Sequence, residues 1–359
     1  ASKKLFSLLL LMIDVNSSTI TTIITTSKAY TFMRIVSLVI MLFLSLLSSN
    51  AAFAQWHQKS FDVMGTLAHV EFWLPDTAEA STADNLIAAV EQEMQRIDQT
   101  MSPYIATSEL SIINRDAATK PVTISPELFD LLTDAQDIAK LTNGMFDITY
   151  ASVGYQYDYR KHQKPDQAAI NTALKAINYQ AVMLDKPTSS VRFANADVKI
   201  DLGGIAKGHA VKNCIAILKD SGIEHALISA GGDTTLLGDR IGRPWFVGIK
   251  HPRADDKTAV QLPLSDESIS TSGDYERYFI EDGVRYHHII NPKTGDSARN
   301  VVSVSIIGKN PTYVDALSTA IFVMGLQQGM LLINELPEYE AIIIDNQQTL
   351  HVSTGLQQD

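Results

Sequence analysis

The 359-residue sequence predicts an α+β fold, a single domain with mixed or antiparallel sheets and flanking helices. Segments with strand character, such as 226–230 and 301–307, are mixed with helical segments, without the regular alternation that a doubly wound parallel sheet requires. The composition is 45% hydrophobic and 19% charged, which is typical of a globular chain. No internal repeat, low-complexity tract or linker divides residues 55–359, so we expect one continuous domain there.

Charge and cysteine usage exclude several classes of protein. The formal net charge is -11 and no basic cluster is present, so no nucleic acid partner is expected. Cys214 is the one cysteine of the sequence, so neither an internal disulfide nor a thiolate zinc cluster stabilises the fold.

The first 54 residues have the features of a leader rather than of a domain. Arg34, the apolar run 35–47 and the small-residue exit Ala52-Phe53-Ala54 make up a secretory signal peptide over residues 33–54. A membrane anchor is the alternative, but the run is shorter than the ~20 residues that a spanning helix needs. We expect cleavage after Ala54, and residues 1–32 are expected to be a non-native upstream extension.

Removal of the leader makes the formal net charge more negative. The first 54 residues contain four basic residues and one acidic residue, so the net charge of -11 becomes -14 for residues 55–359. These properties predict an acidic, disulfide-free protein that is exported and soluble in the bacterial periplasm.

Helices are predicted from apolar spacing and from capping residues. Thr82–Met101 carries apolar residues on one face. Ser125 as N-cap and Pro126 at the first helical position open a helix that runs to about Leu141, where Asn143-Gly144 stops it. Further helices are expected at Gly203–Lys219, Thr312–Met324 and Leu326–Glu335.

Strands are predicted from alternating or continuous apolar runs. The expected strands are Val63–Trp73, Val198–Asp201, Ala226–Ala230, Trp245–Ile249, Tyr275–Ile280, Arg285–Ile290, Val301–Ile307 and Ala341–Asp345. The aromatic and charged segment 155–165 is expected to be a loop.

Two glycine-rich turns follow predicted strands. In the segment 199–208, Asp201 leads into Gly203 and Gly204, which open a helix that carries Lys207; such a start offers free N–H groups to a phosphate. The segment 229–233, Ser-Ala-Gly-Gly-Asp, repeats the arrangement of strand, glycines and acid. An ordinary strand-to-helix turn and a tight turn are the structural alternatives.

Asp315 and Thr319 lie four residues apart on one predicted helix and therefore share a face. A carboxylate and a hydroxyl are hard oxygen ligands of the kind that Mg²⁺ prefers. Thr312 and Asp315 also form a T-x-x-D capping pattern, and the residues taken alone favour that structural role.

Two further segments carry groups that suit a ligand or an acid–base step. His287 and His288 precede the turn Asn291–Gly295, and one of these imidazoles is a candidate general base, although paired histidines in a strand are more often structural or at the surface. A zinc site is not expected, because no HExxH motif or cysteine partner accompanies them. In Met64-Gly65-Thr66 and the downstream Tyr104, a Met, a Gly and a Tyr can sandwich a planar ring, and core packing is the structural alternative.

The order of these motifs closely resembles that of the ApbE family of FAD:protein FMN transferases. The matching elements are Met64–Thr66, Met101–Asn114, Gly144–Thr149, Asp201–Gly208, Ser229–Asp233, His288–Gly295 and Asp315–Ala320. The resemblance covers about residues 60–353 and implies a T-fold-like ApbE domain that is exported to the periplasm.

The resemblance also implies an activity. It implies Mg²⁺-dependent transfer of FMN from FAD, as substrate, to a Thr or Ser hydroxyl of a partner flavoprotein, with release of AMP. The implied acceptor is a subunit of a Na⁺-pumping NADH:quinone reductase, of an Rnf-type complex, or another periplasmic flavoprotein.

The resemblance assigns site residues motif by motif. Mg²⁺ is expected at the carbonyl of Gly204 and the side chains of Asp315 and Thr319, with another acid sometimes in place of Ser318. His288 is the candidate for proton transfer, with Asp201 as the alternative. The implied contacts of the flavin nucleotide are Met64, Tyr104, Met145, Phe146, Asp147, Asp201, Lys207 and Ile290.

Departures from the family pattern concern the loop that faces the substrate. A W-x-F-G stretch is common where this chain has 153–158, and His209 and Asn291 replace a common Tyr and Asp. Two other functions remain open: an FAD pyrophosphatase that forms FMN and AMP, and a periplasmic flavin-binding protein without turnover.

Overall fold

The computed structural model describes residues 55–75, 80–254 and 257–357. The expected signal peptide, its cleavage site and the upstream extension lie outside these residues. Within the described part, no helix combines the length and the hydropathy that crossing a membrane requires.

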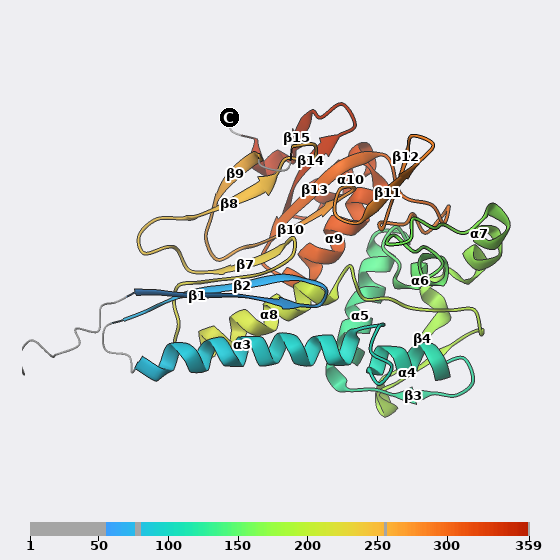
Figure 1. The fold of residues 1–359 in the computed structure, drawn as a ribbon, viewed down its shortest axis with the longest axis horizontal. Helices are drawn as coiled ribbons and strands as arrows, with labels where there is room; N and C mark the ends of the chain where they lie inside the picture. Colours follow the sequence, from blue (N-terminus) through green and yellow to red (C-terminus); the bar gives the residue numbers. More distant parts are fainter. Residues whose placement is uncertain (1–54, 76–79, 255–256, 358–359) are drawn as a thin grey trace, which may run out of the picture. The chain divides into compact units, whose positions relative to one another are not determined.

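The centre of the fold is an eight-stranded sheet in the order β1-β2-β6-β7-β10-β13-β14-β15, in which neighbouring strands are antiparallel (Figure 1). The α+β prediction with antiparallel sheets is therefore confirmed. The strands of this sheet are β1 Gln55–Val63, β2 Thr66–Leu74, β6 Ala226–Ala230, β7 Asp233–Leu237, β10 Ser268–Gly273, β13 Val301–Gly308, β14 Tyr339–Asp345 and β15 Leu350–Val352.

Helices pack on one face of the sheet because their apolar stripes meet its buried side chains. Helix α3 (Ala80–Met101) and helix α8 (Ala206–Asp220) share a core with β2 and β6. Helices α9 (Pro311–Met324) and α10 (Leu326–Asn334) share a second core with β13 and β14. Helices α8 and α9 are neighbours behind the central strands (Figure 1).

The other face is covered by a hairpin of β8 (Trp245–Lys250) and β9 (Thr258–Leu264). Trp245 of this hairpin packs in one apolar cluster with Leu236, Ile269 and Ile342 of the large sheet. A second, separate hairpin is formed by β11 (Tyr278–Glu281) and β12 (Val284–His287), and its open end leads into the site described below.

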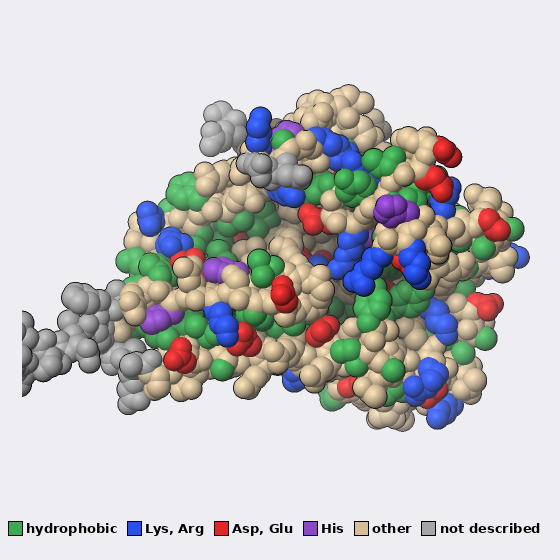
Figure 2. Space-filling view, viewed as in Figure 1, with side chains coloured by type: hydrophobic (Ala, Val, Ile, Leu, Met, Phe, Trp, Pro, Cys, Tyr) green, Lys and Arg blue, Asp and Glu red, His purple; other side chains and the backbone are tan. Residues whose placement is uncertain are grey.

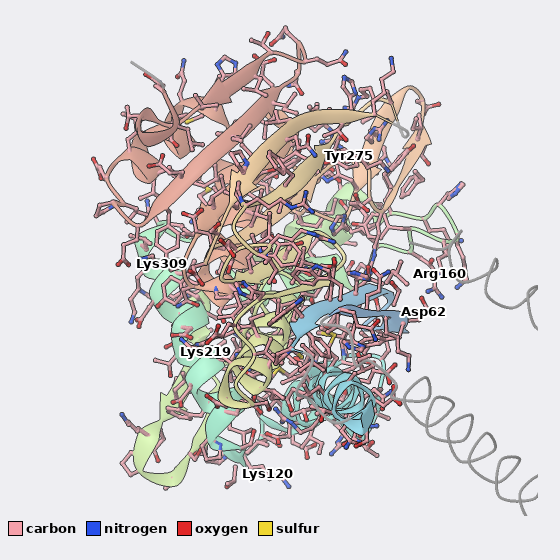
Figure 3. The ribbon with its side chains drawn as sticks, turned by 90° about the vertical axis from the view of Figure 1, so that its left-hand side faces the viewer. Asp62, Lys120, Arg160, Lys219, Tyr275 and Lys309 are labelled. Atoms are coloured by element: carbon pink, nitrogen blue, oxygen red, sulfur yellow. The ribbon has the colours of Figure 1, made fainter. Side chains whose placement is uncertain are left out.

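A smaller subassembly follows α3 in the chain. It contains α4 (Glu109–Asp116), α5 (Pro126–Leu141), α6 (Ala151–Gly154), α7 (Gln167–Ala173) and a sheet of β3 (Val122–Thr123), β5 (Ser190–Phe193) and β4 (Val182–Asp185). Figure 3 shows Lys120, just before β3, at the opposite end of the view from Tyr275, which lies near the β11–β12 hairpin. Asp62 of β1 and Arg160 of the loop after α6 lie on the same side in this view.

Several predicted elements are confirmed closely. Helix α5 begins after Ser125, whose hydroxyl accepts from the N–H of Leu128, and Pro126 occupies the first turn as expected. Strand β6 has the predicted bounds. The segment 155–165 is largely a loop, apart from the bridge between Asp158 and Gln163.

Other element predictions differ from the structure in their bounds, and one is wrong. The predicted strand 63–73 corresponds to β2, the second strand of a hairpin that turns at Met64 and Gly65. The first strand, β1, was not predicted, because its sequence is mostly polar. The predicted strand Val198–Asp201 has no strand partner, because the Asn114 side chain takes both the N–H and the carbonyl of Ile200, each at 2.8 Å. Helix α8 begins at Ala206 rather than at Gly203.

Candidate active site

The first turn of α8 brings a lysine against two buried carboxylates. The Nζ of Lys207 forms an ion pair with Oδ2 of Asp233, at the start of β7, and lies 3.6 Å from Oδ1 of Asp315 on α9. Both carboxylates are almost completely shielded from solvent, whereas Lys207 is half-buried. Three elements distant in sequence therefore meet at one charged cluster.

Burial and charge oppose each other at this cluster. Burial by itself lowers the pKa of Lys207, but the carboxylates of Asp233 and Asp315 outweigh it and hold that pKa above its usual range. Burial, followed by the neighbouring charge of Asp233, raises the pKa of Asp315 to about 7. A second cation beside this pair would favour both ionised carboxylates.

Asp315 also joins α8 to α9. Its Oδ2 accepts a hydrogen bond from the backbone N–H of Gly208 at 2.9 Å, so a side chain of α9 satisfies one of the free N–H groups at the start of α8. The predicted capping role toward its own helix is wrong. The N-cap of α9 is Asn310, whose side chain accepts from the N–H of Thr312, and Thr312 lies inside the helix.

Hydroxyl groups line the neighbouring space. The Oγ1 of Thr319 lies 3.3 Å from the Oγ of Ser272 on β10, which lies 2.9 Å from the Oγ of Ser318. A Cβ atom on Gly204 would lie 3.2 Å from Oγ1 of Thr319, so the glycine turn before α8 runs directly beside this hydroxyl. Ser318 belongs to this layer of neutral hydroxyls.

These oxygens fit a hard divalent cation. In the described part of the chain, no three His, Cys, Asp or Glu side chains gather as a preformed cluster of metal ligands. Mg²⁺ does not need such a cluster, because it usually keeps several waters and binds one or two carboxylates together with substrate phosphates. The Oδ1 of Asp233 is buried and has no hydrogen-bond partner among the described residues, which leaves one acceptor of the cluster unused.

Asp201 is fixed by three donors. Its Oδ1 accepts from the hydroxyl of Tyr150 at 3.0 Å and from the N–H of Gly203 at 2.8 Å, and its Oδ2 accepts from the hydroxyl of Tyr155 at 3.0 Å. Burial, followed by the charge of Asp201, raises the pKa of Tyr155, so its phenol remains a donor. This network suits Asp201 for holding a ligand group in place better than for accepting a proton.

His288 lies at the open end of the β11–β12 hairpin. Its Nδ1 is shielded from solvent and has no hydrogen-bond partner within the described residues. Burial lowers the pKa of His288 to about 3, and the nearby His287, Arg277 and Lys207 add to this effect. The imidazole is therefore neutral at neutral pH, which is the form that accepts a proton.

The predicted flavin contacts at 145–147 lie in the loop after α5, close to the glycine turn. A Cβ on Gly204 would lie 3.4 Å from the ring of Phe146, which is buried. The carboxylate of Asp147 accepts from the N–H and hydroxyl of Thr149 and from the N–H of Tyr179. Met145 packs against the cluster of apolar residues around α9.

The remaining predicted contacts are spread around the site. Met64 adopts a left-handed conformation with φ of 53° in the turn between β1 and β2. Tyr104 is 87% exposed, and its proximity raises the pKa of Tyr155 as a minor effect beside burial. Ile290 is buried against Val153, Tyr157 and Ile170.

Several residues at the site did not stand out in the sequence. Asp233 belongs to a glycine-acid motif that equally suits a tight turn, and only its ion pair with Lys207 reveals its role. Ser272 and Arg277 stand in no motif that the sequence analysis considered. Tyr150 and Tyr155 follow the Gly144–Thr149 motif, but nothing in their spacing indicates that their hydroxyls converge on Asp201.

Comparison with known proteins accounts for this combination of residues. The model of the ApbE family matches residues 64–343, which include all of the clustered groups described above. The chain belongs to the ApbE family. The family that the motif order indicated is therefore confirmed.

Curated relatives of this ApbE chain have FAD:protein FMN transferase as their name. The relative from Treponema pallidum (strain Nichols) is 32% identical over 315 residues, which cover 82% of this chain and 86% of the relative. The relative from Klebsiella pneumoniae (strain 342) is 30% identical over 296 residues, with 81% and 90% covered.

Solved ApbE structures share the fold. The ApbE protein from Thermotoga maritima superimposes with a TM-score of 0.76 at 33% identity, covering 84% of this chain and 98% of that one. The flavin transferase ApbE from Vibrio cholerae gives a TM-score of 0.75 at 26% identity with the same coverage. The α+β fold of this chain is therefore that of the ApbE structures.

Proposed function

We propose that this ApbE chain transfers FMN from FAD to a Thr or Ser hydroxyl of a separate protein and releases AMP. The observation that carries the proposal is the contact of Lys207 with Asp233 and Asp315. These charges stand beside the hydroxyl of Thr319 and the glycine turn at Gly204. Such a set of groups suits a pyrophosphate that binds together with a divalent cation.

Gly204, through its carbonyl, and Asp315 and Thr319, through their side chains, would hold Mg²⁺. Asp233, with its unused Oδ1, is a candidate for a further ligand. When bound, Mg²⁺ supplies positive charge that stabilises the phosphate oxygens and the leaving group. Lys207 would orient the two carboxylates and contact the substrate phosphates.

The proposed step forms one bond and breaks one bond. The acceptor hydroxyl oxygen bonds to the phosphorus of the FMN moiety, and the bond from that phosphorus to the bridging oxygen of the pyrophosphate breaks. AMP leaves with the bridging oxygen, and one proton is released overall. His288 would accept that proton, because its Nδ1 has no hydrogen-bond partner among the described residues; Asp201, whose oxygens already accept hydrogen bonds, is the alternative base.

The flavin nucleotide would be held between the glycine turn and the loops around it. The proposed contacts are those implied by the motifs: Met64, Tyr104, Met145, Phe146, Asp147, Asp201, Lys207 and Ile290. The proximity of Phe146 to Gly204 and the exposure of Tyr104 support this placement. For Asp147, whose carboxylate is already engaged, the contact would involve the backbone.

The proposal includes a place of action. The leader pattern at 33–54 supports export, with a soluble mature form that begins at Gln55 in the periplasm. The acceptor would then be a periplasmic flavoprotein or a subunit of a Na⁺-pumping NADH:quinone reductase or Rnf-type complex. Intact mass of periplasmic material tests the processing; a form that retains residues 33–54 and is found only in membranes would contradict it.

Mass spectrometry of an acceptor incubated with FAD, Mg²⁺ and this protein tests the reaction. The acceptor should gain one FMN, the flavin should survive denaturation, and EDTA should stop the reaction. FMN should not replace FAD, because it lacks the pyrophosphate bond. Free FMN and AMP with an unmodified acceptor would indicate a pyrophosphatase, and no consumption of FAD would indicate a binding protein.

A further inference from the structure

The open end of the β11–β12 hairpin pairs Arg277 with His288. Within the hairpin, Tyr278 lies opposite His287, so the next residues outward, Arg277 and His288, also lie opposite each other. The N–H of His288 donates to the carbonyl of Arg277 at 3.1 Å. Residues directly opposite on antiparallel strands project to the same side, so this end of the hairpin presents a guanidinium and an imidazole together.

The guanidinium of Arg277 reaches the turn between β1 and β2. A Cβ on Gly65 would lie 3.4 Å from Nη2 of Arg277, so the side chain passes over the open face of this glycine. Gly65 has a φ of 69°, a conformation in which a larger residue is strained. Figure 2 shows Lys and Arg side chains gathered next to the closed end of the β1–β2 hairpin.

Arg277 has no hydrogen-bond or ion-pair partner for its side chain among the described residues. Neighbouring arginines differ in this respect, because Arg253 and Arg285 both contact Asp274, and Arg299 pairs with Asp296. Arg277 is also exposed, so its five N–H donors are available to a ligand.

The positive charge of Arg277 affects the pKa values of His288 and of Lys207 in the charged cluster. The pKa of His288 is lowered mainly by burial, then by His287, and then by Arg277. Arg277 also lowers the pKa of Lys207 slightly, against the carboxylates that raise it. Lys207 is compensated by Asp233 and Asp315, so its positive charge is already matched by protein carboxylates. Arg277 adds a positive charge that no protein carboxylate balances within the described residues.

We propose that Arg277 binds the pyrophosphate of FAD and positions it for attack beside His288. This proposal rests on the proposed function and adds a substrate-binding residue to it. A planar guanidinium donates two parallel hydrogen bonds to phosphate oxygens, which a lysine ammonium does not reproduce. The charge on those oxygens increases as the bond to AMP breaks, so Arg277 stabilises the leaving phosphate as well as the bound substrate.

Kinetics of FMN transfer with variants of Arg277 test the proposal. Arg277→Ala should lower kcat/KM for FAD by about 10- to 100-fold, which is the value of a charged hydrogen-bond pair. Arg277→Lys should recover only part of the lost activity, because lysine keeps the positive charge but lacks the planar guanidinium that donates two parallel hydrogen bonds. Arg192→Ala, which removes an exposed arginine on β5, is the matched control and should be unchanged.

Two further measurements separate phosphate binding from a structural role. Guanidinium ions at a non-denaturing concentration should partly restore transfer by Arg277→Ala and have no such effect on Arg192→Ala. In competition with FAD in excess Mg²⁺, ADP should bind wild type more tightly than adenosine does. Arg277→Ala should lose much of this preference, because only ADP carries a pyrophosphate.

The outcomes distinguish this proposal from the proposed function. Absence of FMN transfer by wild type contradicts the proposed function, whatever Arg277 does to ADP binding. Normal transfer by wild type, together with an unchanged preference of Arg277→Ala for ADP, overturns the phosphate role alone. A loss confined to the KM for the acceptor also overturns it and assigns Arg277 to docking of the acceptor.

Discussion

Gly208 donates its backbone N–H to the carboxylate of Asp315, and this contact joins the start of α8 to the second turn of α9. The two helices approach so closely that a Cβ on Gly208 would lie 2.3 Å from the carbonyl oxygen of Pro311 and 2.7 Å from Cβ of Asp315. The same contact orients the second oxygen of Asp315 toward Lys207. Helix packing and the placement of the charged cluster therefore depend on one glycine.

Gly208→Ala should destabilise the protein and impair transfer together. The added methyl group has no space against the backbone of Pro311, so α8 and α9 must separate, at a cost of about 1–3 kcal/mol for an overpacked site. Urea unfolding measures the loss in stability. Gly248→Ala on β8 is the control, because its nearest new contact is a Thr258 methyl group at 3.3 Å and no backbone atom lies within 4 Å among its nearest contacts. Equal stability of the two variants would contradict the packing argument.

Asp315→Asn should separate the structural and metal-binding roles of this side chain. The amide oxygen still accepts from Gly208, so the free energy of unfolding should fall by much less than in Asp315→Ala, which removes the acceptor. Both variants should lose Mg²⁺-dependent transfer, because neither keeps the carboxylate. Thermal unfolding and transfer assays on the pair check this, and near-normal transfer by a folded Asp315→Asn would rule out the metal assignment.

Thr319→Ala should raise the Mg²⁺ concentration needed for half-maximal transfer. The variant removes one hydroxyl from the layer that includes Ser272 and Ser318, but it leaves Asp315 in place. Thr319→Ser keeps the oxygen and should behave like wild type. Titration of Mg²⁺ in the transfer assay measures the shift, and identical Mg²⁺ dependence of the Ala and Ser variants would exclude Thr319 as a ligand.

Much of this site could be predicted because each motif keeps its own local geometry. The glycine turn before α8 and the i, i+4 pair Asp315 and Thr319 are set by short-range rules, and the order of the motifs indicated the family. The capping of α5 by Ser125 followed the same kind of rule. The order of the motifs, rather than any motif alone, therefore indicated Lys207, Asp315 and Thr319 as site residues before their contacts were known.

Contacts between distant segments account for what could not be predicted. The segment 198–201 has strand composition, but Asn114 of α4 supplies the hydrogen bonds that a partner strand would give. Arg277 belongs to no motif, and its position opposite His288 depends on the register of the β11–β12 hairpin. A capping pattern likewise misassigned Asp315, because the N–H that it caps belongs to another helix.

Acid should destabilise the wild-type protein more than it destabilises His288→Gln. The folded-state pKa of His288 is about 3, below the ordinary value of 6.5, so the unfolded chain binds the extra proton between these values. The stability that this group contributes is complete above pH 6.5 and is lost as the pH falls toward 3. Between pH 8 and pH 5 the loss is about 2 kcal/mol.

Urea unfolding of wild type and His288→Gln at pH 8 and pH 5 checks this expectation. The decrease in stability between the two pH values should be smaller in the variant by about 2 kcal/mol, because Gln does not titrate. His287, whose pKa is lowered to about 4 mainly by burial, remains in both proteins and cancels in the comparison. An equal decrease in the two proteins would show that His288 is not held neutral by the fold.

His288→Ala should slow FMN transfer by about 10²- to 10⁴-fold, the usual contribution of a general base. The proton of the acceptor hydroxyl would then have no neutral imidazole to accept it, although the cluster of Lys207, Asp233 and Asp315 remains intact. Binding of FAD should therefore change little, which a fluorescence titration of the flavin measures separately from the rate. His57→Ala, on β1, removes an imidazole that stacks on Phe72 and should leave the rate unchanged. A His288→Ala protein that transfers FMN at the wild-type rate would assign proton transfer to another group, and Asp201→Asn would then be the variant to compare.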